Sequence, residues 1–167
     1  MTYTSAQAAK LLAKLQQEHT RLSCHEEQAK TFVASVGEDV ESVRPDYDYE
    51  KTREELASLE AAIRTVKHAV NVFNATTVVP GFTMTVDEML VYLPQLTKRK
   101  SKLKEMVDTL PKARENGYSR NNFIDYRYIN YDLEAVKADL DAVTEELAKA
   151  QLALDEVNHT LTFEIDV

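Results

Sequence analysis

The sequence has little of what marks a disulfide-bonded, secreted or membrane-spanning protein. Its 167 residues include one cysteine, three glycines, four prolines and no tryptophan. The single cysteine, Cys24, excludes an internal disulfide, which suits a reducing compartment. No apolar run approaches the ~20 residues that a membrane-spanning helix needs, and residues 1–10 lack the basic and apolar regions of a signal peptide. We therefore expect a cytoplasmic protein with no membrane partner.

The charge balance is acidic, and this bears on the class of partner. Aspartate and glutamate number 28 against 20 lysines and arginines, which gives a net charge of −8. Such a charge argues against general affinity for nucleic acid, although a local basic patch can depart from the total. The length predicts one domain, residues 1–167, with a sizeable core. Alanine, leucine, glutamate and lysine dominate its regular stretches, and these residues favour helix.

Heptad repeats are the strongest positive signal. One stripe comprises Tyr49, Thr52, Leu56, Leu59, Ile63, Val66, Val70 and Phe73. A second comprises Leu133, Val136, Leu140, Val143, Leu147, Ala150, Leu154, Val157 and Leu161. An apolar side chain every 3.5 residues keeps one face of a helix against a partner helix along its length. The repeats predict long helices that pack on one another.

Local signals place four helices, at about 5–36, 48–74, 86–111 and 131–159. Thr85 and Glu88 form a capping-box pattern at the third helix, and Gly37 stands where a helix C-terminus favours glycine. Pro94 lies inside the third helix and predicts a kink or a restart.

The links between these helices favour an antiparallel four-helix bundle with coiled-coil-like packing. We expect six stripe residues to be buried in one core: Leu59, Ile63, Val66, Leu140, Val143 and Leu147. Residues 161–167 alternate apolar and polar, which is typical of a strand. Thr76–Val79 is the nearest candidate partner for that strand, and a frayed extended tail is the alternative.

Tyrosine and arginine gather in the links that the bundle places at one end, and they form the candidate binding site. The site residues are Tyr47, Tyr49, Arg114, Arg120, Phe123, Tyr126, Arg127 and Tyr128. Tyrosine and arginine are enriched at protein interfaces, and aromatics beside arginines also bind single-stranded RNA or phosphate groups. A third interpretation is a structural cap, in which acidic residues 37–50 dock on basic residues 112–131.

Signals for other chemistry are weaker. Glu156 and His159 have the Glu-x-x-His spacing of di-iron bundles, but that site needs a second copy and two more glutamates. Lysines and arginines at 98–104 spread around a helix, where a solvated face is the simpler interpretation, while Lys100 falls on the packing stripe. No catalytic signature is present, so we expect no enzyme, metal or cofactor.

Parts of the chain are similar to a small, mostly uncharacterised bacterial family, some of whose members are labelled septicolysin-like. The resemblance lies in Asn74–Thr77, Gly81 and Thr83–Thr85 before a helix with a basic middle, and in the close of the last helix from Leu152 to Leu161. His159 stands where the family has an aromatic residue. The resemblance implies an intracellular helical protein without an established activity, and the label implies a cytolysin.

These observations predict a non-enzymatic cytoplasmic helical protein. It acts through protein–protein contacts and self-association, so its expected partner is a second copy of the chain or another protein. The first alternative is an RNA- or phosphate-binding module that uses the tyrosine- and arginine-rich end. The second alternative is a septicolysin-like toxin component.

Overall fold

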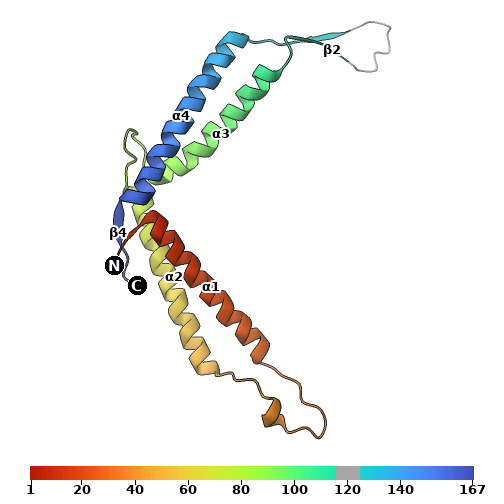
Figure 1. Cartoon of the computed structure of the whole chain (residues 1–167), viewed down its shortest axis with the longest axis vertical. Coiled ribbons are helices and arrows are strands. Elements are labelled where there is room, and N and C mark those ends of the chain that lie inside the picture. The colour runs from red at the N-terminus through yellow and green to blue at the C-terminus, as the bar shows by residue number, and fades with distance from the viewer. Residues whose placement is uncertain (116–124) are drawn as a thin grey trace. The chain divides into compact units, whose positions relative to one another are not determined.

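The computed structural model describes residues 1–115 and 125–167, and these residues confirm a mainly helical fold. Four α-helices are present in the described part of the chain: α1 (Ser5–Ala29), α2 (Tyr49–Thr76), α3 (Val86–Asp108) and α4 (Leu133–Thr160) (Figure 1). A short 3₁₀ helix, η1 (Val40–Val43), lies between α1 and α2. Four short strands complete the described elements: β1 (Thr2–Thr4), β2 (Lys112–Arg114), β3 (Tyr126–Tyr128) and β4 (Thr162–Glu164).

The chain divides into two compact units. The first unit comprises Met1–Thr77 and Glu156–Val167, and the second comprises Val78–Asp155. The first unit therefore holds α1, α2, β1, β4 and the last turn of α4. Each unit is built around a helical hairpin, and a single core shared by all four helices stays a prediction.

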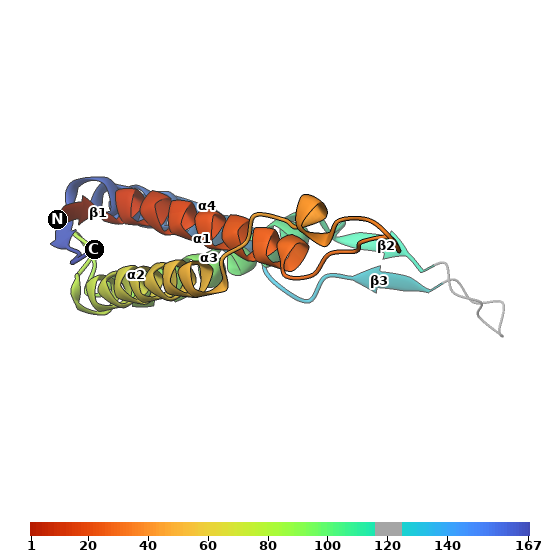
Figure 2. The same ribbon diagram turned by 90° about the horizontal axis from the view of Figure 1, so that it is seen from below.

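In the first unit, α1 and α2 lie side by side as a hairpin (Figures 1 and 2). Ala8 of α1 and Val66 of α2 are fully buried and form a core with Ile165, which follows β4. Phe73 of α2 stacks on Phe163 of β4 with ring centroids 4.6 Å apart. The terminal strands thus cover the apolar end of the hairpin.

The C-terminal strand is confirmed, but its predicted partner is wrong. β4 pairs antiparallel with β1, so that Tyr3 lies opposite Phe163, while Val78 of the expected partner segment bridges to Thr85 instead. Both Tyr3 and Phe163 pack on the core around Ala8 and Val66. Pairing with β1 therefore lets two aromatic side chains cover one core from neighbouring strands.

The second unit contains α3 and α4 as its helices, and each buries one apolar stripe. On α3 the buried residues are Val86, Met89 and Leu96; on α4 within this unit they are Val136, Val143, Leu147, Ala150 and Leu154. The hydroxyl of Tyr92 donates a hydrogen bond from α3 to the Glu146 carboxylate of α4.

Burial along the predicted stripes is less complete than expected. Val66, Val143 and Leu147 are buried, but Leu59, Ile63 and Leu140 are half-buried. A helix in a hairpin covers one side of its neighbour, so much of each stripe stays at the margin of the contact.

Two helix boundaries differ from the prediction. The first helix ends at Ala29 instead of residue 36. Gly37 is not its C-terminal glycine; it takes its positive φ of 89° within the turn that Glu38 closes by donating to the Ser35 carbonyl. The third helix ends at Asp108, and it runs through Pro94 without a restart.

The predicted capping box of α3 is confirmed. The Thr85 N–H donates to the Glu88 carboxylate at 2.7 Å, and the Glu88 N–H donates to Thr85 Oγ1 at 3.3 Å. Thr4 and Gln7 form an equivalent box at the start of α1, and Asp48 caps α2.

Candidate functional site

An exposed aromatic cluster of the second unit lies on a two-stranded ribbon, β2–β3. The structure pairs β2 with β3 antiparallel. Lys112 lies opposite Tyr128, and Arg114 lies opposite Tyr126. Within the second unit, the ribbon extends beyond the ends of α3 and α4 (Figure 1). The end of α3 and the ribbon together line one groove, described below.

One face of the ribbon is aromatic and basic. Side chains alternate between the two faces of a strand, so Tyr126 and Tyr128 share a face with Lys112 and Arg114. The ammonium of Lys112 lies 4.2 Å from the ring centroid of Tyr126 and 5.4 Å from that of Tyr128, within cation–π range. Tyr126 is 47% exposed and Tyr128 is 61% exposed. We call these four residues the aromatic–basic face.

Arg127 lies on the opposite face of the ribbon, together with Ala113. Its guanidinium donates two hydrogen bonds to the Glu115 carboxylate, at 2.8 and 2.9 Å. This bidentate pair raises the pKa of Arg127 above its ordinary value, chiefly through the hydrogen bonds. Because Arg127 is already paired within the ribbon, it is less available to an external anion than Lys112 and Arg114.

A groove lies beside the ribbon, between it and the end of α3. Its volume is about 600 Å³, and its lining includes Met106, Leu110, Tyr128, Ile129 and Tyr131. Leu110 is 67% exposed. The Tyr131 hydroxyl donates to the Met106 carbonyl at 2.7 Å and so joins the start of α4 to the end of α3. The groove offers an apolar surface next to the aromatic–basic face.

The two remaining tyrosines of the candidate site belong to the first unit. The Tyr47 hydroxyl donates to Glu26 Oε1 of α1 at 2.9 Å. Partial burial and this hydrogen bond to a carboxylate raise the pKa of Tyr47. Tyr49 is 59% exposed at the start of α2, with Arg53 5.9 Å from its ring centroid. Tyr47 therefore joins the link between α1 and α2 to α1 through a hydrogen bond, whereas Tyr49 is exposed to solvent.

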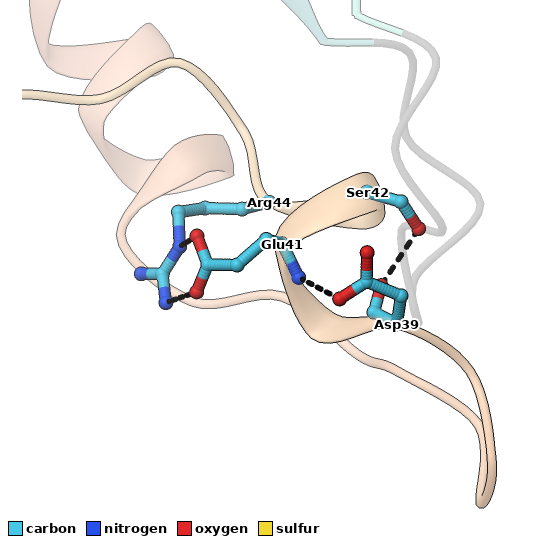
Figure 3. Close-up of polar contacts among 4 residues, drawn as sticks. All are labelled: Asp39, Glu41, Ser42 and Arg44. Carbon is cyan, nitrogen blue, oxygen red and sulfur yellow. Dashed lines mark hydrogen bonds and ion pairs between the residues drawn. The ribbon is translucent and has the colours of Figure 1, made fainter.

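The acidic link before α2 satisfies many of its own polar groups around η1 (Figure 3). Asp39 accepts a hydrogen bond from the Glu41 N–H at 3.2 Å, and Ser42 Oγ donates to the Asp39 carbonyl at 2.7 Å. Arg44, the one cation of residues 37–50, donates to both carboxylate oxygens of Glu41 at 2.7 and 2.8 Å. These bonds lower the pKa of Glu41.

The structure thus brings together part of the predicted site. Arg114, Tyr126, Arg127 and Tyr128 share the ribbon, and Arg120 and Phe123 lie outside the described residues. Docking of the acidic link on the ribbon stays a prediction. Sequence reasoning missed Lys112, which contacts both exposed tyrosines. The alternation Tyr126-Arg127-Tyr128 is the signal that could have revealed a shared face.

Metal binding and membrane insertion are two further properties on which the described residues bear. Across residues 1–115 and 125–167, no three His, Cys, Asp or Glu side chains converge closely enough to hold a metal ion. In the same part of the chain, no helix has the length and apolar character needed to cross a membrane.

Comparisons with known proteins inform the fold but give no activity. No family model matches the chain, and no curated protein matches it. A crystal structure described as that of a functionally unknown conserved protein from Corynebacterium diphtheriae is similar, with a TM-score of 0.60 and 17% sequence identity. The alignment covers 98% of this chain and 100% of that chain. At this identity the likeness shows a shared fold alone.

Proposed function

We propose that this chain is a non-enzymatic helical protein that acts through protein–protein contacts, including self-association, and that its contact surface is the aromatic–basic face of the ribbon. A cytoplasmic location is part of this proposal. The partner is a second copy of the chain or another protein, and its contact surface carries apolar and acidic side chains.

The exposure of Tyr126 and Tyr128 is the observation that carries the proposal. Two large aromatic rings on one projecting face, beside exposed Leu110, expose apolar surface that water solvates poorly. Tyrosine combines a large apolar contact area with a hydroxyl that bonds at the rim of an interface. Lys112 and Arg114 on the same face favour acidic groups on the partner.

The charge of the ribbon favours a protein partner over RNA. Lys112, Arg114 and Arg127 are accompanied by two acidic residues, Glu115 and Asp125, in the described part of the link. Arg127 is committed to Glu115. Affinity for RNA depends heavily on cations that neutralise phosphates, and few are available here. An apolar and hydrogen-bonding contact with protein demands less positive charge.

Light scattering of purified chain at micromolar concentrations tests the proposal. The native chain should have an average mass above the 19.0 kDa of the monomer. The double variant Tyr126→Ser/Tyr128→Ser should shift toward 19.0 kDa while its thermal midpoint stays the same. A matched control, Val91→Ser/Leu152→Ser, removes two exposed apolar side chains from helices of the same unit and should leave the mass unchanged.

Two results would contradict this function. If the ribbon variant associates like the native chain, the aromatic–basic face is not the contact surface. If instead the variant lowers the thermal midpoint and the association of its folded fraction is unchanged, the ribbon is a structural cap.

Binding of single-stranded RNA is a second candidate, because Tyr126 and Tyr128 are two rings on one strand beside two cations. Bases stack on such rings with little sequence preference. A labelled uridine oligomer, followed by fluorescence anisotropy, should then bind with an affinity that falls linearly in log–log terms with salt. Absence of binding, or binding that ignores salt, eliminates this candidate.

A further inference from the structure

A second groove lies in the first unit, between α2 and β4. Its volume is about 760 Å³. One wall is the face of α2 from Thr65 to Thr76, and the other is the chain from Thr160 to Asp166, which includes β4. This groove belongs to the part of the chain that packs around Ala8, Val66 and Ile165.

The free edge of β4 borders this groove. Among residues 1–115 and 125–167, β4 pairs in its sheet with β1 alone. The Ile165 N–H donates to the Met1 carbonyl at 2.8 Å, so Ile165 directs its backbone toward β1. Backbone groups alternate between the two edges of an antiparallel strand. The N–H and C=O groups of Thr162 and Glu164 therefore point to the other edge, and both residues line the groove. An edge of this kind is a template for another strand.

The groove combines apolar patches with carboxylates. Val72 of α2 is 48% exposed and Leu161 is 40% exposed, so both offer apolar contact area. Glu164 and Asp166 supply carboxylates at the strand side. Among the described residues that line the groove, none is lysine or arginine. The charge of the groove is therefore complementary to a basic ligand.

Three threonine hydroxyls reinforce this preference. Thr65, Thr76 and Thr160 each donate their hydroxyl hydrogen to a carbonyl of their own helix, at 3.1, 2.8 and 2.7 Å respectively. A hydroxyl has one hydrogen and two lone pairs, so these groups can only accept further hydrogen bonds. The groove thus presents acceptors from both walls, which suits a ligand rich in N–H donors.

We propose that this groove binds an extended, basic peptide segment of a partner protein, which adds to β4 as a third strand. The backbone groups of Thr162 and Glu164 would supply the main-chain hydrogen bonds. Alternate side chains of the peptide would cover Val72, and lysine or arginine side chains would bind Glu164 and Asp166.

The length of the groove sets the length of the peptide. Thr65 to Thr76 spans roughly 16 Å along the helix axis at ~1.5 Å per residue. An extended peptide advances about 3.3 Å per residue, so about five residues fill the groove. This inference does not rest on the proposed function of the ribbon, since the two surfaces belong to different units.

Selection from a phage library of random seven-residue peptides, with the full chain as bait, tests the proposal. Enriched sequences should alternate apolar residues with lysine or arginine. A synthetic peptide of the most enriched sequence should slow hydrogen exchange at the Thr162 and Glu164 amides, as followed by NMR. Its dissociation constant should rise by about tenfold or more in Val72→Arg, because a cation would then line the groove.

Two further variants make the result decisive. Glu164→Lys should weaken the basic peptide to a similar degree, and it places its change on the exposed side of β4, where folding is least affected. Val91→Arg, the same change on an exposed helical valine of α3, should alter the affinity less than about twofold. The proposal is overturned if no peptide is enriched, if the enriched peptides lack basic residues, or if Val72→Arg and Glu164→Lys bind like the native chain.

Discussion

At the residue scale, Thr85 and Glu88 fix the start of α3, because each side chain accepts a hydrogen bond from the backbone N–H of the other residue. Thr85→Ala should lower the free energy of unfolding by about 1 kcal/mol, because the Glu88 N–H loses its acceptor. Glu88→Ala should cost less, and the double variant should cost less than the sum of the two. Chemical denaturation measures all three. Thr83→Ala, at an exposed position outside the box, is the control and should change little, and strict additivity of Thr85 and Glu88 would contradict a formed box.

A second residue-scale prediction concerns Tyr92, whose hydroxyl donates to the Glu146 carboxylate. This hydrogen bond, followed by partial burial, raises the pKa of Tyr92 above its ordinary value. A raised pKa means that the folded protein holds the phenol proton more tightly than the unfolded chain does. The stabilisation is therefore fully present below the unfolded pKa and is lost as pH rises through the folded pKa.

The matching experiment uses Tyr92→Phe. The variant should lose roughly 0.5 to 1.5 kcal/mol of unfolding free energy at neutral pH, and its deficit against the native chain should shrink at alkaline pH. The difference in ultraviolet titration between the two proteins reports the ionisation of Tyr92 itself. A midpoint at or below that of an unfolded tyrosine would show that the hydrogen bond to Glu146 does not form. Tyr128→Phe, at a 61% exposed position, serves as the control.

At the element scale, the paired terminal strands β1 and β4 close the first unit. Ile165 is 1% exposed and belongs to the core with Ala8 and Val66. Ile165→Ala should therefore lower the free energy of unfolding by about 2 to 5 kcal/mol, through lost burial and the cavity left behind. Val167→Ala, two residues later and 46% exposed, should change it by less than about 0.5 kcal/mol. Equal effects at the two positions, measured by denaturation, would show that β4 does not pack on this core.

The elements also show what the sequence alone could predict. Heptad spacing located α2 and α4, and the box at Thr85 placed the start of α3 correctly. The end of α1 was wrong, because Gly37 resembles a helix terminator but serves a turn beyond the helix. β1 was missed, since three residues are too few to show a period. The degree of burial also escaped prediction, because a heptad indicates a helix face but not how much of it a neighbour covers.

The candidate site, like the helices, was predictable in part from the sequence. Its residue types pointed to the links, and Arg114, Tyr126, Arg127 and Tyr128 do share one ribbon. Their division between two faces depends on the pairing register, which brings Lys112 to the tyrosines and Arg127 to Glu115. A register between strands of three residues is set by contacts made in the folded chain, so the sequence did not reveal it.

At the scale of the whole molecule, the net charge of −8 contrasts with the cations of the aromatic–basic face. If two acidic chains associate through this face, the cations of the face attract acidic side chains on the partner. Salt screens this attraction between exposed groups. Light scattering should therefore show a lower average mass at high ionic strength than at low ionic strength. A mass that rises with salt would indicate a purely apolar contact.

The most direct test of the proposed function replaces Tyr128 with a photo-crosslinking amino acid in cells that produce the chain. Illumination should join the ribbon to a second copy of the chain or to another protein, and Arg114→Glu should reduce the yield because it reverses a charge on the same face. The same crosslinker at Leu152, which is 70% exposed on α4, controls for random encounters. The proposed function predicts a discrete protein adduct at Tyr128 and none at Leu152. Adducts with equal yield at both positions, or no protein adduct at Tyr128, would contradict it.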